Sequence, residues 1–181
     1  GALAEFGVMG SALAQVYLGI DEPKVGLLNI GEEPGKGRAL EKEAYRLLSE
    51  RPIRFVGNVE GRDLGTGAAD VFVTDGFTGN VALKVAEGTA RAVAAVVLET
   101  LAADEDPDFQ AAAGSVLPKL LAVRERFDPD SHGGAHLVGV KGTVVIAHGS
   151  SSRLAIANAL AVAAEGASRD LPGTIEAGLH G

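Results

Sequence analysis

The sequence predicts an α/β fold, a three-layer α/β/α sandwich built around a mostly parallel sheet. Short apolar runs of the kind that form buried strands recur at residues 24–30, 53–56 and 71–73. A polar segment that contains glycine follows each run, and helical patterns lie between or after the runs. Because strands that alternate with helices pair in parallel through right-handed crossovers, this order favours a parallel sheet.

The helical patterns of the first half differ in character. Residues 3–18 are rich in alanine and leucine, and Gly7 and Gly10 would allow this helix to pack closely. Residues 38–50 place apolar and charged positions at helical spacing and predict an amphipathic helix. A long helix is predicted over residues 78–102, and its second half is apolar on almost all sides. We expect such a helix to be buried in the core or against a partner chain.

The second half predicts further helices and a hairpin-like pair of strands. The Lys141-Gly142 pair suits a tight turn between the two strands, and Pro118 is expected near the start or at a kink of the preceding helix. We expect one domain over residues 1–181, the C-terminal part of a longer enzyme, with a helical and acidic excursion over residues 104–130. The predicted elements are a helix at 109–127, strands at 135–140 and 142–147, and helices at 153–166 and 173–179.

Composition narrows the class of protein. With 181 residues, of which 46% are hydrophobic, the chain can bury a core of its own. It has no cysteine, which excludes a disulfide scaffold, a thiol nucleophile and thiolate metal sites. The net charge of −8 argues against a general nucleic-acid surface. Charged residues interrupt the apolar region at 81–101, so no bilayer-spanning helix is predicted.

Four predicted strand ends carry glycine and polar residues, and we expect them to lie along one edge of the sheet. Ligands of open α/β sheets bind beyond the carboxyl ends of the strands. In residues 70–84 a strand, a glycine turn and a helix start follow within a few residues, which forms a cradle for an anion. The four strand ends are Gly31-Glu32-Glu33, Gly57-Asn58, Asp75-Gly76 and His148-Gly149-Ser150-Ser151.

Four stretches of sequence together resemble one family more specifically than any of them does alone. In order and spacing they closely resemble the PlsX family, the phosphate acyltransferases of bacterial phospholipid synthesis. The stretches are residues 25–31 with Lys36-Gly37, residues 55–64, residues 75–77 with 79–84, and Gly133-Gly134-Ala135 followed by residues 147–151.

The resemblance implies an activity: an acyl group passes from acyl carrier protein to inorganic phosphate, giving acyl phosphate and free carrier protein. It also implies a homodimer, no cofactor, and a fold similar to isopropylmalate dehydrogenases and phosphotransacetylases. The expected location is the cytoplasm, with peripheral contact at the inner membrane face or with a membrane acyltransferase. The family's chain is nearly twice as long, so its N-terminal half is missing here. The acidic residues of 104–108 oppose stable membrane contact.

The implied reaction sets the chemistry that the site must supply. Phosphate needs positioning more than deprotonation, and the thioester carbonyl needs fixed N–H donors as it becomes an oxyanion. No metal site is expected, because the spacing of His132 and His136 is common. The expected catalytic residues are Asn80, Lys84 and His148. The expected phosphate- or substrate-binding residues are Lys36, Gly37, Asn58, Arg62, Asp75, Gly76, Gly79, Gly149, Ser150 and Ser151.

Each candidate residue also has a purely structural interpretation. Thr78-Gly79-Asn80 either binds phosphate or the oxyanion, or caps the long helix. Asp75 either orients a donor or forms a turn. His148 either protonates the leaving thiolate or is a hydrogen-bonded histidine at a strand end.

The charged candidates leave similar alternatives open. Lys36, Lys84 and Arg62 either neutralise phosphate or are solvated surface residues, and Glu60 could fix Arg62. Glu32-Glu33 would repel phosphate unless paired, so we expect them to have a structural role or to orient a partner. The basic run at residues 119–126 either docks the acidic carrier protein or is a solvated helix face.

Two other functions remain open on the sequence. One is a phosphotransacylase that uses a coenzyme A thioester, and the other is an inactive fragment that retains dimer or carrier-protein binding. A dehydrogenase is disfavoured, because no Gly-x-Gly-x-x-Gly fingerprint opens a helix.

Overall fold

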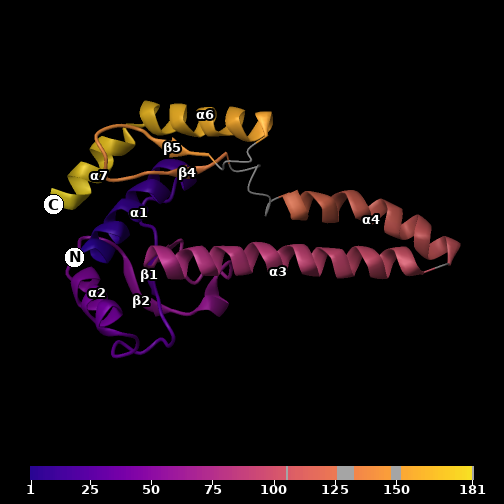
Figure 1. The fold of residues 1–181 in the computed structure, drawn as a ribbon, viewed down its shortest axis with the longest axis horizontal. Helices are drawn as coiled ribbons and strands as arrows, with labels where there is room; N and C mark the ends of the chain where they lie inside the picture. The colour runs from indigo at the N-terminus through magenta and orange to yellow at the C-terminus, as the bar shows by residue number, and fades with distance from the viewer. Residues whose placement is uncertain (105, 126–132, 148–151, 181) are drawn as a thin grey trace.

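The computed structural model describes residues 1–104, 106–125, 133–147 and 152–180 (Figure 1). It is a mixed α/β structure in which helices flank a parallel three-stranded sheet, as the sequence predicted. The elements, in chain order, are α1 (Ala2–Leu18), β1 (Val25–Leu28), α2 (Ala39–Ser49), β2 (Phe55–Val59), η1 (Gly61–Asp63), β3 (Val71–Val73), α3 (Gly76–Ala103), α4 (Pro107–Glu125), β4 (Ala135–His136), β5 (Val145–Ile146), α6 (Arg153–Ser168) and α7 (Leu171–His180).

The parallel sheet has the strand order β2-β1-β3, with β1 in the centre. Val25 of β1 pairs with Phe55 of β2 and with Val71 of β3. Glycine at position 26 leaves room for Val59 on the neighbouring strand β2, because a Cβ on Gly26 would lie 2.7 Å from a methyl carbon of Val59. All three strands run in the same direction, so their carboxyl ends meet at one edge. This arrangement is compatible with a three-layer sandwich of the phosphotransacetylase type.

Helices α1 and α2 cover one face of the sheet and form the main core with it. The two predicted close contacts of α1 are present: a Cβ on Gly7 would lie 2.5 Å from Cδ2 of Leu48, and one on Gly10 would lie 2.6 Å from Cγ1 of Val71. The sequence therefore predicted both the helix and its close packing. The buried members of this core are Leu3, Ala4, Val25, Leu27, Ala44, Leu48 and Val73.

A second core joins the other side of α1 to the C-terminal helices (Figure 1). Met9 and Val16 of α1 pack there with Leu171 and Ile175 of α7. Tyr17 adds a polar tie, because its hydroxyl donates to the carbonyl of Val162 in α6 at 2.8 Å. Helix α1 therefore lies between the two cores. Nine of its residues are buried, and five of these belong to the cores: Leu3, Ala4, Met9, Ala12 and Val16.

Helices α3 and α4 form an arm that extends away from the rest of the molecule (Figure 1). Helix α3 begins at Gly76, two residues earlier than predicted, and has no buried residue. Of the two surroundings expected for this helix, burial in the core of this chain is not observed, and burial against a partner chain stays a prediction. Helix α4 has Pro118 in its interior and corresponds to most of the predicted excursion. The expectation of a single domain remains a prediction.

The predicted hairpin is present but shorter than expected. Strands β4 and β5 pair antiparallel, with Ala135 opposite Ile146 and His136 opposite Val145. Within the described residues they form a separate two-stranded sheet. The prediction that four strand ends share one edge thus holds for the ends of β1, β2 and β3. The strand before the fourth end, β5, was expected in the same sheet, but within the described residues it pairs with β4 in the separate sheet, so that part of the prediction was wrong. The end itself, at His148–Ser151, lies outside the described residues.

Candidate active site

A network of amide hydrogen bonds joins strand β2 to the loop after β1. The side-chain amide of Asn29 donates to the carbonyl of Lys36 and to Oδ1 of Asn58, both at 3.1 Å. Asn58, which is 6% exposed, donates in turn to the carbonyl of Glu33 at 2.7 Å. Both ends of the Asn58 amide are therefore engaged in holding the 31–37 loop. The structure gives Asn58 a positioning contact, and phosphate binding by its side chain stays a prediction.

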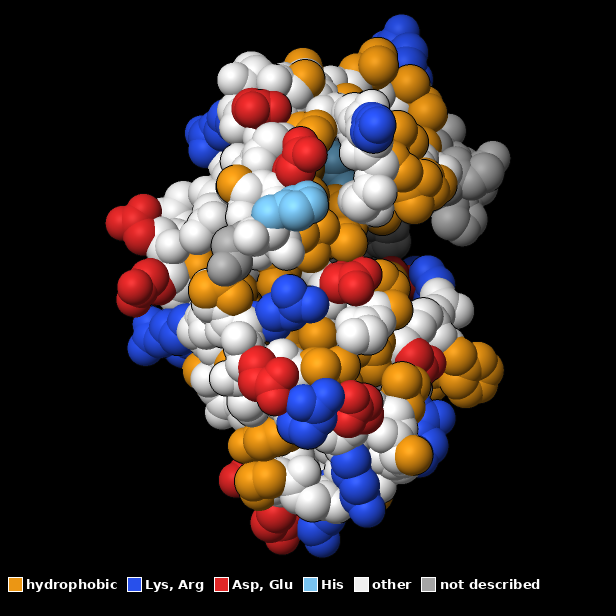
Figure 2. All heavy atoms as spheres, turned by 90° about the vertical axis from the view of Figure 1, so that its left-hand side faces the viewer, with side chains coloured by type: hydrophobic (Ala, Val, Ile, Leu, Met, Phe, Trp, Pro, Cys, Tyr) orange, Lys and Arg blue, Asp and Glu red, His pale blue; other side chains and the backbone are white. Residues whose placement is uncertain are grey.

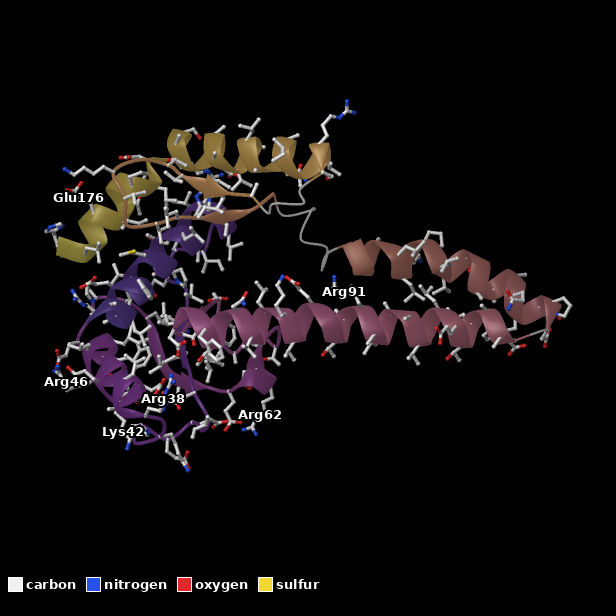
Figure 3. All side chains as sticks on the ribbon, viewed as in Figure 1. Arg38, Lys42, Arg46, Arg62, Arg91 and Glu176 are labelled. Carbon is white, nitrogen blue, oxygen red and sulfur yellow. The ribbon has the colours of Figure 1, made fainter. Side chains whose placement is uncertain are left out.

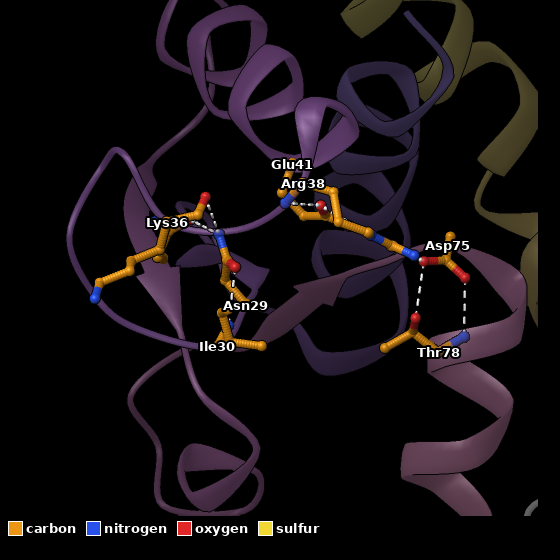
Figure 4. Close-up of polar contacts among 8 residues, drawn as sticks. Asn29, Ile30, Lys36, Arg38, Glu41, Asp75 and Thr78 are labelled. Atoms are coloured by element: carbon orange, nitrogen blue, oxygen red, sulfur yellow. Dashed lines mark hydrogen bonds and ion pairs between the residues drawn. The ribbon is translucent and has the colours of Figure 1, made fainter.

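Arg38 connects the start of α2 to the start of α3 (Figure 4). Its guanidinium is held by the carboxylate of Glu41, and its Nη2 also donates to Oδ2 of Asp75 at 2.8 Å. The backbone N–H of Arg38 donates to Glu41 Oε2 at 2.7 Å, which satisfies one of the free donors at the start of α2. Figure 3 shows Arg38 between α2 and the base of the arm. This residue ties the two helix starts together.

The buried carboxylate in this network stays ionised because of its partner. Glu41 is 7% exposed, and the hydrogen bonds from Arg38 lower the pKa of its carboxyl group. The same bonds raise the pKa of Arg38 further above its already high value. Arg38 therefore remains a fixed cation at the edge of the sheet.

Asp75, rather than Thr78-Gly79-Asn80, caps the long helix. Its carboxylate accepts from the backbone N–H of Thr78 at 2.9 Å and from the Thr78 hydroxyl at 2.8 Å. These bonds, followed by the one from Arg38, lower the pKa of Asp75 to about 2. The anion position that the sequence predicted at Thr78-Gly79-Asn80 is thus held by the protein's own carboxylate. Asn80 is exposed on the first turns of α3.

The N–H groups of the first helical turn are divided between used and unused donors. Those of Thr78 and Gly79 are bonded to Asp75. Within the described residues, those of Gly76 and Phe77 have no acceptor. Donors at these two positions remain available for an anion or a carbonyl oxygen.

The predicted cations each lie beside a carboxylate. The ammonium of Lys36 is 3.7 Å from Glu33, and it points away from the Arg38–Asp75 pair (Figure 4). Lys84 lies 2.9 Å from Glu87 on its own helix. The two lysine side chains are about half exposed, so solvent weakens both ion pairs.

The loop after β2 shows the pairing that was considered for its acidic residues. Arg62 lies 2.9 Å from Glu60 and 3.0 Å from Glu32. The expected contact between Glu60 and Arg62 is confirmed. Glu32 and Glu33 are both paired with cations, as a structural role requires.

A cavity of about 450 Å³ lies at the carboxyl edge of the sheet, between the loop after β1 and the start of α3. Gly37 contributes to its wall with a φ of +88°, and a Cβ there would lie 2.7 Å from Asn29 Oδ1. The lining residues are Leu28, Asn29, Ile30, Gly37, Arg38, Glu41, Thr74 and Thr78. Its position matches the site expected for an open α/β sheet.

Sequence reasoning found part of this site and missed part of it. It named Gly37, Asn58, Asp75, Gly76 and Gly79, which lie in or beside the strand-end region. It placed Arg38 and Glu41 only in an amphipathic helix. Their spacing of three residues at a helix start was the signal that a capping pair was present. The predicted residues His148, Gly149, Ser150 and Ser151 lie outside the described residues.

Two surveys of the described residues bear on the site. No group of three or more histidine and acidic side chains there is arranged to hold a metal ion. His136 instead packs on the ring of Tyr17 with ring centres 4.8 Å apart, and burial lowers its pKa. Among the helices in the described ranges, none has the length and apolarity needed to cross a bilayer. Figure 2 shows positive and negative side chains interspersed over the end of the molecule opposite the arm.

Comparison with known proteins gives close relatives over nearly the whole chain. A phosphate acyltransferase of Pseudothermotoga lettingae is 48% identical over 178 residues, which cover 96% of this chain and 53% of that protein. A phosphate acyltransferase of Bacillus cereus (strain G9842) is 45% identical over 173 residues, covering 96% of this chain and 52% of that protein. One from Elusimicrobium minutum is 48% identical over 161 residues, covering 89% and 47%.

The chain spans about half the length of the curated relatives that it matches. The matched region includes the three strand ends, the start of α3 and the arm, because the sequence model of the family described as "Fatty acid synthesis protein" matches residues 1–173. With this match and identities of 45–48% to proteins named phosphate acyltransferase, the chain belongs to the PlsX family of acyltransferases.

Proposed function

We propose that this chain forms part of an enzyme that transfers a fatty acyl group from acyl carrier protein to inorganic phosphate, giving acyl phosphate for phospholipid synthesis. The observation that carries the proposal is the 48% identity to a phosphate acyltransferase over 96% of the chain. The cavity at the carboxyl edge of the parallel sheet supports it, because ligands of such sheets bind there.

In the proposed reaction a phosphate oxygen attacks the thioester carbonyl carbon directly. The C–S bond breaks, and the carrier thiolate leaves and takes up a proton. Arg38 supplies a fixed positive charge for phosphate, and the unused N–H groups of Gly76 and Phe77 suit the developing oxyanion. Holding the two reactants in the correct relative orientation can lower the activation barrier by about 7–11 kcal/mol.

The remaining predicted residues take roles within the same proposal. Lys36 and Arg62 would exchange their carboxylate partners for phosphate, and Asn80 and Lys84 would orient the substrates from α3. His148 would protonate the leaving thiolate, and the Gly149-Ser150-Ser151 segment would bind phosphate. The carrier protein, being acidic, would dock near the basic residues of α4, where opposite charge speeds encounter.

The proposal is tested by an acyl-transfer assay on a chimera. The N-terminal half of the Pseudothermotoga protein is joined ahead of residue 1, and release of free carrier thiol is measured with acyl carrier protein and phosphate. We expect thiol release that depends on phosphate. A folded chimera that releases no thiol would contradict the proposal.

The same assay separates the two rival functions. Faster transfer from acyl-coenzyme A than from acyl carrier protein would favour a coenzyme A phosphotransacylase. Activity of the chimera but not of the 181-residue chain would mean that this chain alone retains binding without catalysis. Omitting phosphate is the control for simple thioester hydrolysis.

We further propose that the arm is covered by a second copy of the chain, as a homodimer. Val93, Val96 and Val97 of α3 follow helical spacing and are 57%, 62% and 38% exposed. Apolar surface of this extent is unusual on a monomer. Sedimentation should show association that Val93→Glu weakens and Ala95→Glu, which is exposed on the other side of α3, leaves unchanged. Equal behaviour of both variants would contradict an interface at these valines.

The proposed location is the cytoplasm, with peripheral contact at the membrane face or with a membrane acyltransferase. Asp104, Asp106 and Asp108 lie at the connection between α3 and α4. Their charge opposes binding to anionic lipids. Co-sedimentation with vesicles of neutral and anionic lipid measures this contact, and stronger binding to anionic vesicles would contradict the charge argument.

A further inference from the structure

A second groove borders the strand-end cavity across the turn at Asp75. The cavity is bounded by Thr74 and Thr78, whereas the groove, of about 280 Å³, is bounded by Asp75 and Gly76. Its walls come from the first turns of α1 and from α2, which lie side by side near the N-terminus in Figure 1. The apolar side chains that line it are Ala2, Leu3, Ala4, Phe6, Leu40, Ala44 and Leu47, and Gly1 also borders it.

The groove presents apolar surface to water and little unpaired charge. Phe6 and Leu40 are each 47% exposed on its walls. Its two carboxylates are in ion pairs, Glu43 with Arg46 at 2.7 Å and Asp75 with Arg38 at 2.8 Å. Covering such a surface with an apolar ligand is favourable, because it removes the exposed carbon atoms from water.

We propose that this groove binds the alkyl chain of the acyl substrate and of the acyl phosphate product. The inference rests on the proposed function, because that function places the phosphate in the strand-end cavity, and the inference adds that the alkyl chain of the acyl group lies in the groove. The carbonyl group would then lie at the turn between them, beside the unused N–H groups of Gly76 and Phe77. Ligand pockets commonly hold about 300–1,000 Å³, so the groove suits one chain segment and not a larger body.

The test uses n-alkyl phosphates of eight to sixteen carbons, which are stable analogues of acyl phosphate. Their affinity for the 181-residue chain is measured by calorimetry below their critical micelle concentrations. We expect affinity to rise about fourfold for each added methylene until the groove is filled. Leu40→Trp, which fills the groove, should weaken dodecyl phosphate roughly tenfold or more and leave inorganic phosphate unaffected.

Two further variants keep the test decisive. Phe6→Ala removes one apolar wall and should also weaken dodecyl phosphate. Leu18→Trp is the matched control, because Leu18 is 62% exposed at the other end of α1 and does not line the groove. The inference is wrong if Leu40→Trp binds dodecyl phosphate as tightly as the unmodified protein. It is also wrong if Leu18→Trp weakens the binding of dodecyl phosphate equally, because the alkyl chain would then bind outside the groove.

The outcomes are distinct from a failure of the proposed function. If the chimera transfers acyl groups and Leu40→Trp does not change its preference for acyl-chain length, the groove inference is wrong and the proposed reaction stands. If the chimera transfers no acyl group but binds alkyl phosphates with an affinity that depends on chain length and that Leu40→Trp abolishes, the groove inference stands and the proposed reaction is wrong.

Discussion

Helices α1 and α3 have similar compositions but opposite surroundings. Both are rich in alanine, valine and glycine, yet α1 has nine buried residues and α3 has none. Helix α1 packs on β3, α2 and α7, whereas the described contacts of α3 are mainly with α4. Whether an apolar helix is buried therefore depends on the elements that pack against it. Its own sequence of apolar residues does not show whether it lies in a core or on an exposed arm.

The largest expected effect comes from truncating one apolar side chain on each helix. Met9→Ala on α1 should lower the free energy of unfolding by about 2–5 kcal/mol, because Met9 is 9% exposed in the second core. Leu83→Ala on α3, which is 55% exposed, should change it by less than about 0.5 kcal/mol. Urea unfolding of dilute protein measures both. Similar losses from the two variants would contradict the contrast between the helices.

A subtler pair tests the glycines. A Cβ on Gly10 would lie 2.6 Å from Cγ1 of Val71, whereas nothing lies within 4 Å of one on Gly88. Gly10→Ala should therefore destabilise the protein by about 1–3 kcal/mol through overpacking. Gly88→Ala should stabilise it by about 0.5–1 kcal/mol, because alanine loses less conformational entropy in a helix. Thermal unfolding gives the sign of each change, and destabilisation by Gly88→Ala would show that the arm is packed at that position.

The smallest expected change in stability comes from Asp75, which caps the start of α3. The pKa of Asp75 is lowered to about 2 from its ordinary value of 3.8, so the folded protein holds this proton less tightly than the unfolded chain. Its stabilising contribution is present above about pH 4 and is lost as the pH falls through about 2. Asp75→Asn should therefore reduce the loss of stability between pH 4 and pH 2.

Urea unfolding at several pH values measures this difference. Asp21→Asn is the control, because Asp21 is exposed and its carboxylate accepts no hydrogen bond in the described part of the chain. An unchanged pH dependence in Asp75→Asn would contradict the bonds from Thr78 and Arg38 to this carboxylate.

How far the sequence predicted the structure depends on the range of the interactions. The three strands, helix α1 with its close-packed glycines, and helix α6 follow from local patterns. The structure adds the cap of α6, where Ser152 accepts from the N–H of Ala155 at 3.2 Å. The start of α3 was misplaced, because aspartate and threonine are both good caps and only the geometry shows that Asp75 accepts the bonds.

The candidate site was harder to predict than the fold. Its predicted glycines and Asp75 follow strand ends, which a pattern of apolar runs locates. The bond from Arg38 to Asp75 joins residues 37 positions apart, so no local spacing predicts it. The partners of Lys36 and Lys84 likewise depend on which carboxylate lies within reach after folding.

The central claim is that the chemistry takes place at the carboxyl edge of the parallel sheet and at the first turns of α3, and not farther along the arm. A crystal structure of the chain soaked with phosphate tests it most directly. The account predicts phosphate in the cavity between Gly37, Arg38 and the turn at Asp75. Phosphate bound on α4 or on the C-terminal half of α3, with this cavity empty, would contradict it.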